Sequence, residues 1–174
     1  MASSVLDRLR FDNPFNLSID EILVKLKEKK ILYLSNPANP TGRYIPKNER
    51  KEILDSGICL LLDEAYVEFA IESCSDLIYK YENLFIFRTF SKAFGMAGLR
   101  FGYLLTHVNN IDILRKNRNS KELNSFSQIA VVEALRNYSI YKERIEEINE
   151  QRDLFVKNVN LINARIQAYA SMAN

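Results

Sequence analysis

The stretch TFSKAFGMAGLR, residues 89–100, follows an apolar run, Leu84–Phe87, that predicts a buried strand. The small residues of this stretch allow a bulky ligand to approach the backbone closely. Its hydroxyl groups and the Arg100 fork suit a phosphate, and Lys92 on such a turn can be partly desolvated, which favours its use as a Schiff-base nucleophile. A phosphate clamp beside an amine nucleophile is what a pyridoxal phosphate site requires. The alternative is an ordinary strand and a glycine-containing loop, with Lys92 and Arg100 in solvent.

Composition narrows the class of protein. The chain has 174 residues, 47% of them hydrophobic, which is enough for one domain with a sizeable core. Its net charge of +2 gives no basic field for nucleic acid, and the apolar run Ile58–Leu62 is far too short to span a bilayer. Two cysteines, Cys59 and Cys74, are expected to be free thiols in a reducing compartment, so we expect a cytoplasmic protein. The single histidine, His107, gives no basis for a histidine metal site or a Ser-His triad, and we expect no metal.

Periodicity predicts alternating strands and helices. The expected strands are residues 31–34, 58–62, 84–87 and 101–105, and the expected helices are residues 18–30, 46–57, 75–82, 109–117, 125–137 and 138–162. Three strand-to-helix repeats indicate βαβ units with right-handed crossovers. We therefore expect an α/β fold, a three-layer α/β/α sandwich, whose strand order the sequence does not give. Residues 164–174 show strand-like alternation.

Polar residues follow the other predicted strands as well. The loop Ser35–Gly42 contains two Asn-Pro pairs, so it is neither helix nor central strand, and it places Asn39 after the first strand. Asp63 comes directly after five apolar residues, where a carboxylate needs a cationic partner or solvent, and Tyr66 follows three residues later. An ordinary turn and a solvated strand end are the alternatives. Ligands of α/β sheets bind at the carboxyl ends of strands, so these residues are candidates for one site.

Three motifs in this order carry a resemblance to a known family. They are SNPANPTG at residues 35–42, DEAYVEF at residues 63–69 and RTFSKAFGMAGLRFGY at residues 88–103. The chain resembles the fold-type I pyridoxal-phosphate aminotransferases of classes I and II, and most closely the histidinol-phosphate aminotransferase branch. All three motifs in order are specific for the superfamily and less specific for the substrate.

The resemblance implies a role for each motif residue, with pyridoxal 5′-phosphate as the cofactor. Lys92 bonds to the cofactor aldehyde and, once released, moves the proton between the substrate and the cofactor. Asp63 keeps the pyridine nitrogen protonated, and Asn39 and Tyr66 donate hydrogen bonds to the phenolic oxygen. The remaining implied residues hold the phosphate: Thr89, Ser91 and Arg100.

The resemblance covers roughly residues 12–174, the middle of such an enzyme. It implies that residues 1–174 are a single, incomplete cofactor-binding large domain, without the C-terminal small domain whose arginine binds the substrate carboxylate. Family members form homodimers, so we expect a homodimer.

Three functions are compatible with these motifs. The first is transfer of an amino group between an amino compound, such as histidinol phosphate, and a 2-oxo acid. The second is decarboxylation of a phosphorylated amino acid at the same kind of site. The third is a non-catalytic, truncated fragment of the aminotransferase fold.

Overall fold

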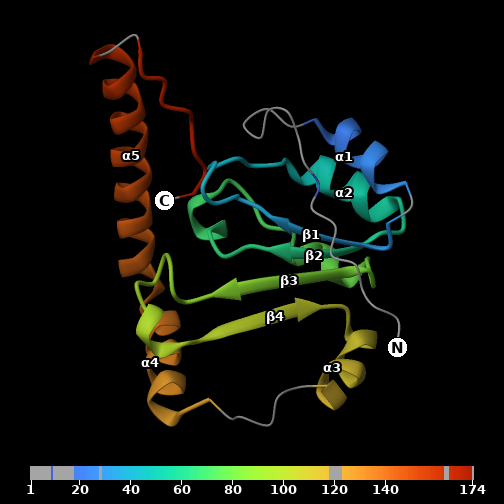
Figure 1. Cartoon of the computed structure of the whole chain (residues 1–174). Helices are drawn as coiled ribbons and strands as arrows, with labels where there is room; N and C mark the ends of the chain where they lie inside the picture. The colour runs from blue at the N-terminus through green and yellow to red at the C-terminus, as the bar shows by residue number, and fades with distance from the viewer. Residues whose placement is uncertain (1–8, 10–17, 28, 118–122, 163–164, 174) are drawn as a thin grey trace.

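A four-stranded sheet forms the centre of the computed structural model, which describes Leu9 and residues 18–27, 29–117, 123–162 and 165–173. The strands are β1 (Ile31–Ser35), β2 (Cys59–Asp63), β3 (Leu84–Thr89) and β4 (Gly102–Thr106), in the order β1-β2-β3-β4 (Figure 1). The first three strands are parallel, as the βαβ prediction requires. β4 is antiparallel to β3, so the third predicted repeat is wrong. The segment between β3 and β4 contains only the 3-10 turn η3 (Ala97–Leu99), and without a crossover helix the chain simply turns back.

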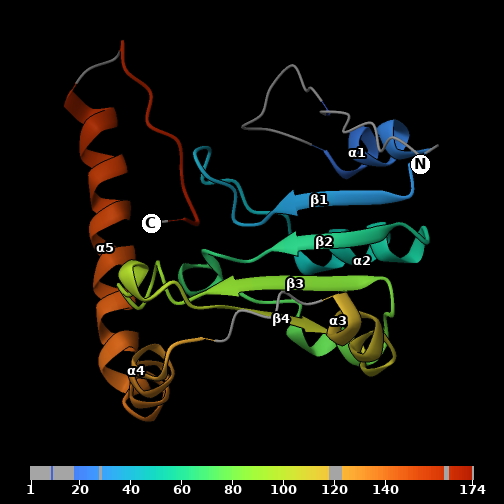
Figure 2. The same cartoon turned by 60° about the horizontal axis from the view of Figure 1, so that its bottom comes forward.

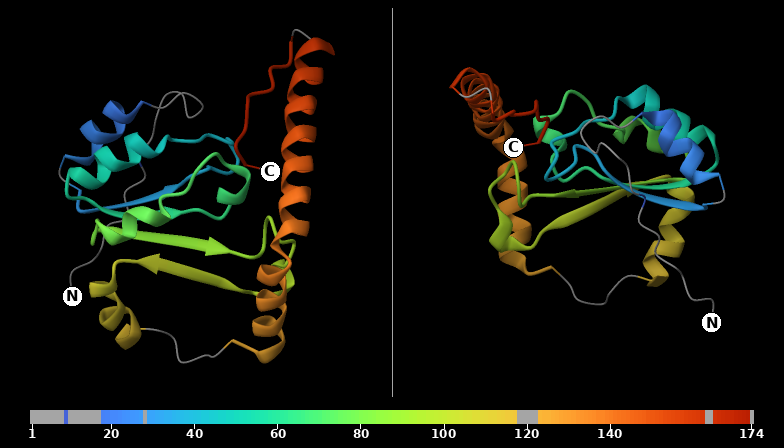
Figure 3. Two further views of the ribbon diagram at one scale, coloured as in Figure 1. Left: turned by 180° about the vertical axis from the view of Figure 1, so that it is seen from behind. Right: turned by 45° about the horizontal axis from the view of Figure 1, so that its top comes forward.

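One face of the sheet carries the main core. α1 (Ile19–Leu26), α2 (Lys47–Asp55) and the 3-10 helix η2 (Ser75–Tyr79) pack their apolar side chains against this face. On the opposite face, Ile31 and Tyr33 are each 61% exposed and Phe87 is 38% exposed. The described residues therefore show the sheet and one of the two helical layers expected of a sandwich, as the right-hand view of Figure 3 illustrates.

Local sequence explains where these helices begin and end. The Ser18 hydroxyl accepts a hydrogen bond from the Glu21 backbone N–H at 3.1 Å, which caps α1. Pro46 was expected as the first residue of α2, but it is the N-cap, and the helix begins at Lys47. Gly57 follows the end of α2 with φ +82°, a conformation that favours glycine. The expected helix at residues 75–82 is instead the shorter η2.

The C-terminal half of the described chain is helical. It contains η4 (Val108–Asn110), α3 (Ile111–Asn117), α4 (Ser125–Arg136) and α5 (Tyr138–Ile162), close to the predicted ranges. α5 stands beside the carboxyl ends of β1–β3 (Figure 1). Within α5, Ile145 is buried, whereas Phe155 and Ile162 are exposed.

The last described segment, residues 165–173, forms neither helix nor strand, although its sequence alternates as a strand does. Ala164 and Asn174 lie outside the described residues. The segment runs back beside α5 (Figure 2), and the Met172 N–H donates to the Gly42 carbonyl at 2.7 Å. No helix among the described residues combines the length and the apolar character needed to cross a membrane.

Candidate cofactor site

The carboxyl ends of β1, β2 and β3 meet at one edge of the sheet, because these strands are parallel (Figure 1). Backbone hydrogen bonds tie the segments that leave these strands together. The Asn36 N–H donates to the Asp63 carbonyl at 2.9 Å, and the Glu64 N–H donates to the Phe87 carbonyl at 2.9 Å. The structure thus brings the three sequence motifs to one edge of the sheet.

Asn39, Tyr66 and Lys92 form a connected group. The Asn39 amide donates to the Tyr66 hydroxyl at 2.9 Å, and the Lys92 Nζ lies 5.2 Å from the centre of the Tyr66 ring. Because the Tyr66 oxygen accepts from Asn39, its own O–H and the second Asn39 N–H can both donate to another oxygen. The Lys92 side chain itself is exposed, so the partial desolvation expected of this turn is not seen in the described structure.

The Lys92 segment is held in place by its aromatic neighbours. Phe90 and Phe94 are buried, with ring centroids 4.5 Å apart, and both belong to a second apolar cluster with Val131 of α4 and Ile145 of α5. The lysine thus stands on an anchored loop, a more precise platform than a free one.

Asp63 uses both carboxylate oxygens. Oδ1 accepts from the Ala65 N–H at 3.0 Å, and Oδ2 accepts from the Tyr33 hydroxyl at 2.5 Å. Partial desolvation of the otherwise exposed Tyr33 side chain, together with the hydrogen bond and the negative charge of Asp63, raises its pKa to about 12. Sequence reasoning missed Tyr33. Its contact with Asp63 depends on the register of β1 against β2, in which Ser35 pairs with Asp63.

The predicted phosphate group is only partly assembled. The Thr89 and Ser91 hydroxyls lie 2.9 Å apart, and the Ser91 N–H donates to the Thr89 oxygen at 3.1 Å. Arg100 has a left-handed backbone with φ 54°, and its guanidinium donates to the Ala97 carbonyl at 3.3 Å. The structure therefore brings the two hydroxyls together, whereas the Arg100 guanidinium contacts the backbone of residue 97 instead of these hydroxyls.

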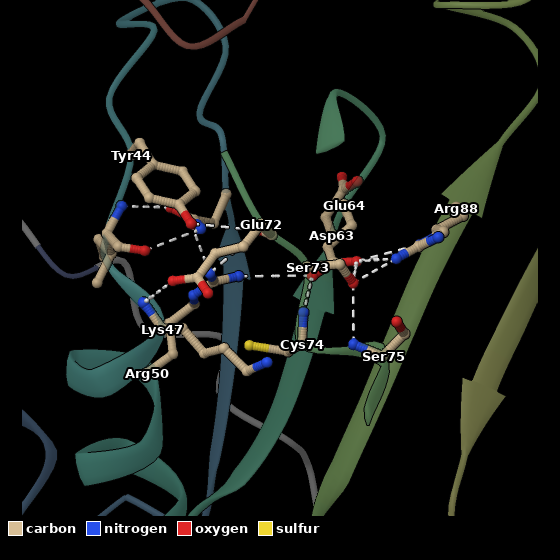
Figure 4. A network of polar contacts seen from close by, with 12 residues as sticks. Tyr44, Lys47, Arg50, Asp63, Glu64, Glu72, Ser73, Cys74, Ser75 and Arg88 are labelled. Carbon is tan, nitrogen blue, oxygen red and sulfur yellow. Dashed lines mark hydrogen bonds and ion pairs between the residues drawn. The ribbon is translucent and has the colours of Figure 1, made fainter. Parts of the chain in front are cut away.

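The buried acid of the DEAYVEF motif is Glu64, which sequence reasoning overlooked. Its side chain is fully buried and pairs with Arg88 and Arg50 (Figure 4). The need for a cationic partner, expected for Asp63, applies instead to its neighbour. The signal was available in the sequence, because adjacent strand residues point to opposite faces and two successive acids follow the apolar run.

The residues present fit a phosphorylated pyridine aldehyde. Asp63 offers a carboxylate to a protonated ring nitrogen, the Asn39–Tyr66 pair offers donors to a phenolate, and Lys92 offers an amine to an aldehyde. The Thr89 and Ser91 hydroxyls offer hydrogen bonds to phosphate oxygens.

Comparison with known proteins agrees with this chemistry. The family model of class I and II aminotransferases matches residues 3–174. A histidinol-phosphate aminotransferase of Pyrococcus furiosus is 40% identical over 139 residues, which are 80% of this chain and 41% of that protein. A dihydroxyacetone phosphate transaminase of Campylobacter jejuni is 39% identical over 155 residues, 87% of this chain and 42% of that protein. The chain spans less than half the length of either relative.

Solved structures share the fold. The structure of the Sinorhizobium meliloti histidinol-phosphate aminotransferase in complex with pyridoxal-5′-phosphate has a TM-score of 0.81 at 25% identity, covering 93% of this chain and 46% of that one. A decarboxylase of Sulfurospirillum multivorans has a TM-score of 0.79 at 25% identity, covering 91% and 49%. These likenesses confirm the α/β fold expected from the resemblance. Since the family model matches nearly the whole chain, the chain belongs to the class I and II aminotransferase family.

Proposed function

We propose that this chain binds pyridoxal 5′-phosphate through Lys92 and supplies the cofactor-binding part of an enzyme that transfers an amino group to a 2-oxo acid. The observation that carries the proposal is the hydrogen-bonded Asn39–Tyr66 pair beside the Lys92 amine. Asp63 lies at the same sheet edge, on the next parallel strand. When bound, the cofactor supplies an electron sink for the carbanion formed at the substrate Cα.

The chain's own residues bind and orient the cofactor and transfer the proton in this proposal. Lys92 would hold the cofactor by condensing its amine with the aldehyde carbon and losing water, and once released the amine would carry the proton to and from the substrate Cα. Asp63 holds a proton on the ring nitrogen by charge, and Tyr66 and Asn39 orient the ring by donating to its phenolic oxygen. Thr89 and Ser91 bind the phosphate, and Arg100 joins them if its side chain turns away from the Ala97 carbonyl.

The relatives suggest a phosphorylated substrate. Histidinol phosphate and dihydroxyacetone phosphate both appear in the names of relatives about 40% identical to this chain, and both compounds carry a phosphate. We infer that one of the two compounds that exchange the amino group carries a phosphate, with histidinol phosphate as the first amino donor to test. We also infer a homodimer, which the exposed apolar side chains of α4 and α5 support, and a reducing, cytoplasmic compartment, which the unpaired Cys59 and Cys74 support.

The second candidate is decarboxylation of a phosphorylated amino acid, which the similarity to the Sulfurospirillum multivorans decarboxylase favours. The two reactions share the cofactor residues and differ in which bond at the substrate Cα is broken. Release of carbon dioxide without formation of an amino acid from the 2-oxo acid would identify the decarboxylase. If cofactor binds but neither reaction occurs, the isolated chain is a non-catalytic module.

Cofactor attachment tests the proposal directly. Pyridoxal phosphate is titrated into the chain, the lysine-bound absorbance band is followed, and borohydride-reduced protein is mapped by mass spectrometry. We expect the label on Lys92 and its loss in Lys92→Ala. Lys80→Ala is a matched control, because the Lys80 Nζ also lies over a tyrosine ring, 5.0 Å from the Tyr81 centroid. A label that persists in Lys92→Ala, or none on a folded chain, would contradict the proposal.

A further inference from the structure

Glu64 is a fully buried carboxylate with a complete set of partners (Figure 4). Arg88 donates to its Oε2 twice, from Nε at 3.0 Å and from Nη2 at 2.8 Å. The Ser73 hydroxyl donates to Oε2 at 2.8 Å, and the Cys74 N–H donates to Oε1 at 2.9 Å. Arg50 of α2 approaches Oε1 at 3.5 Å. Helix α2, the ends of two strands and the 73–74 loop are thus joined at one charged group.

The positions of Glu64 and Arg88 in the chain connect this network to the cofactor site. Glu64 directly follows Asp63 at the end of β2, and Arg88 directly precedes Thr89 at the end of β3. Between them, the Glu64 N–H donates to the Phe87 carbonyl at 2.9 Å. The ion pair therefore fixes the spacing between the strand end that carries Asp63 and the strand end that leads to Lys92.

The network also adjoins the hydrogen bond that holds the Asp63 side chain. The N–H that holds Asp63 Oδ1 belongs to Ala65, the residue after Glu64. A shift of the Glu64 backbone moves this donor directly. On the other strand, the Ser91 N–H is held by the Thr89 hydroxyl, one residue beyond Arg88. Each partner of the ion pair thus neighbours a hydrogen bond within the site.

We propose that the pair of the buried Glu64 and the partly buried Arg88 is a positioning device for the cofactor site, holding Asp63 and the Lys92 loop at the separation that the cofactor requires. The proposal rests on the proposed function. A buried ion pair is by itself weak support for a gain in stability, because desolvation offsets the attraction between the charges. The pair constrains geometry more than it stabilises the fold. Two nitrogens of the Arg88 guanidinium donate to a single oxygen of Glu64, and a lysine cannot reproduce this geometry.

The test compares Glu64→Gln and Arg88→Lys with a matched control, Tyr81→Phe. The control removes the half-buried hydrogen bond from the Tyr81 hydroxyl to Asp55, 2.8 Å long and away from the site edge of the sheet. Amide hydrogen exchange of the cofactor-free chain is measured by NMR at three reporters. Ala65 and Ser91 report on the site, and Leu60, which donates to Asn83 at 2.8 Å, reports on the far half of β2.

We expect Glu64→Gln to speed exchange at Ala65 and Ser91 by at least about tenfold more than at Leu60, because the loss is local. Arg88→Lys should speed exchange at the same two residues by a smaller factor. Tyr81→Phe should not speed exchange at Ala65 and Ser91 more than at Leu60. Equal acceleration at all three reporters in Glu64→Gln would overturn the proposal and leave the pair a purely structural role.

A second measurement separates this proposal from the proposed function. Pyridoxal phosphate is titrated into the wild type and the same variants, and we expect weaker binding in Glu64→Gln but not in Tyr81→Phe. If the wild type binds no cofactor, the proposed function fails, and hydrogen exchange alone decides the positioning role. If the wild type binds cofactor and Glu64→Gln binds it equally well, the positioning proposal fails while the proposed function stands.

Discussion

Replacing Gly42 by alanine tests how the C-terminal segment is held against the loop that carries Asn39. Gly42 has φ +67°, and a Cβ built on it would lie 2.1 Å from the Ser171 Oγ and 2.8 Å from the Ser171 Cα. The second contact is with backbone, so a rotamer change of Ser171 cannot relieve it. The segment must move away, and the hydrogen bond from the Met172 N–H to the Gly42 carbonyl is then lost.

The expected cost has three parts, one conformational and two from lost contacts. A left-handed conformation costs an L-residue other than glycine about 1–2 kcal/mol. Loss of the Met172 hydrogen bond adds about 1 kcal/mol, and exposure of the buried Ala173 methyl adds a further ~1 kcal/mol. We therefore expect Gly42→Ala to lower the free energy of unfolding by about 3–4 kcal/mol, a large share of the stability of a typical domain.

Urea unfolding measured by circular dichroism gives this free energy, since the chain has no tryptophan for fluorescence. Gly57→Ala is the matched control, because Gly57 has φ +82° and nothing within 4 Å of its built Cβ, so that only the conformational part applies. Adding Ser171→Gly to Gly42→Ala should recover part of the difference, because it removes the two side-chain contacts and leaves the backbone contact. Equal losses in Gly42→Ala and Gly57→Ala would refute the reasoning.

Three further predictions concern single side chains. The folded-state pKa of Tyr33, about 12, lies above its ordinary value of 10.0. The Tyr33 hydroxyl therefore contributes stability that is complete below pH 10 and is lost as the pH rises through 12. Tyr33→Phe should reduce this loss of the free energy of unfolding, measured by urea unfolding at alkaline pH. Burial raises the pKa of the Cys74 thiol to about 12, so a thiol reagent should modify Cys59 before Cys74 in the folded chain and both equally in urea, as peptide mapping will show. Tyr66→Phe should weaken pyridoxal phosphate binding about tenfold by removing one hydrogen bond to a charged oxygen, whereas Tyr79→Phe, at an exposed site, should not change the titration.

Much of the fold follows from local pattern. Apolar runs predicted the four strands to within a residue or two, and a 3.6-residue period predicted α5, because these signals depend only on neighbours in sequence. The antiparallel direction of β4 was missed, although residues 90–101 show no helical pattern for a crossover. The strand-like alternation of residues 164–174 forms no strand in its described part, because alternation does not supply a pairing partner.

Part of the candidate site could also be predicted from the sequence, and part of it depends on the folded structure. Asn39, Tyr66 and Lys92 could be grouped from motif order, since each follows a parallel strand and such strands end at a common edge. The contact between Tyr33 and Asp63 could not, because it depends on strand register and on which side chains share a face. The direction of the Arg100 guanidinium depends on the left-handed turn at that residue, which an arginine rarely adopts and which no local pattern indicated.

The meeting of three separate loops at one sheet edge has a thermodynamic consequence for the polypeptide as a whole. Asn39, Asp63 and Lys92 are far apart in the chain and converge only after the strands have paired, so an unfolded chain cannot offer this binding site. A small molecule that engages all three favours the native state in proportion to the logarithm of its free concentration. Cofactor supply would then help to set how much of the chain is folded, and its withdrawal would expose the chain to proteolysis.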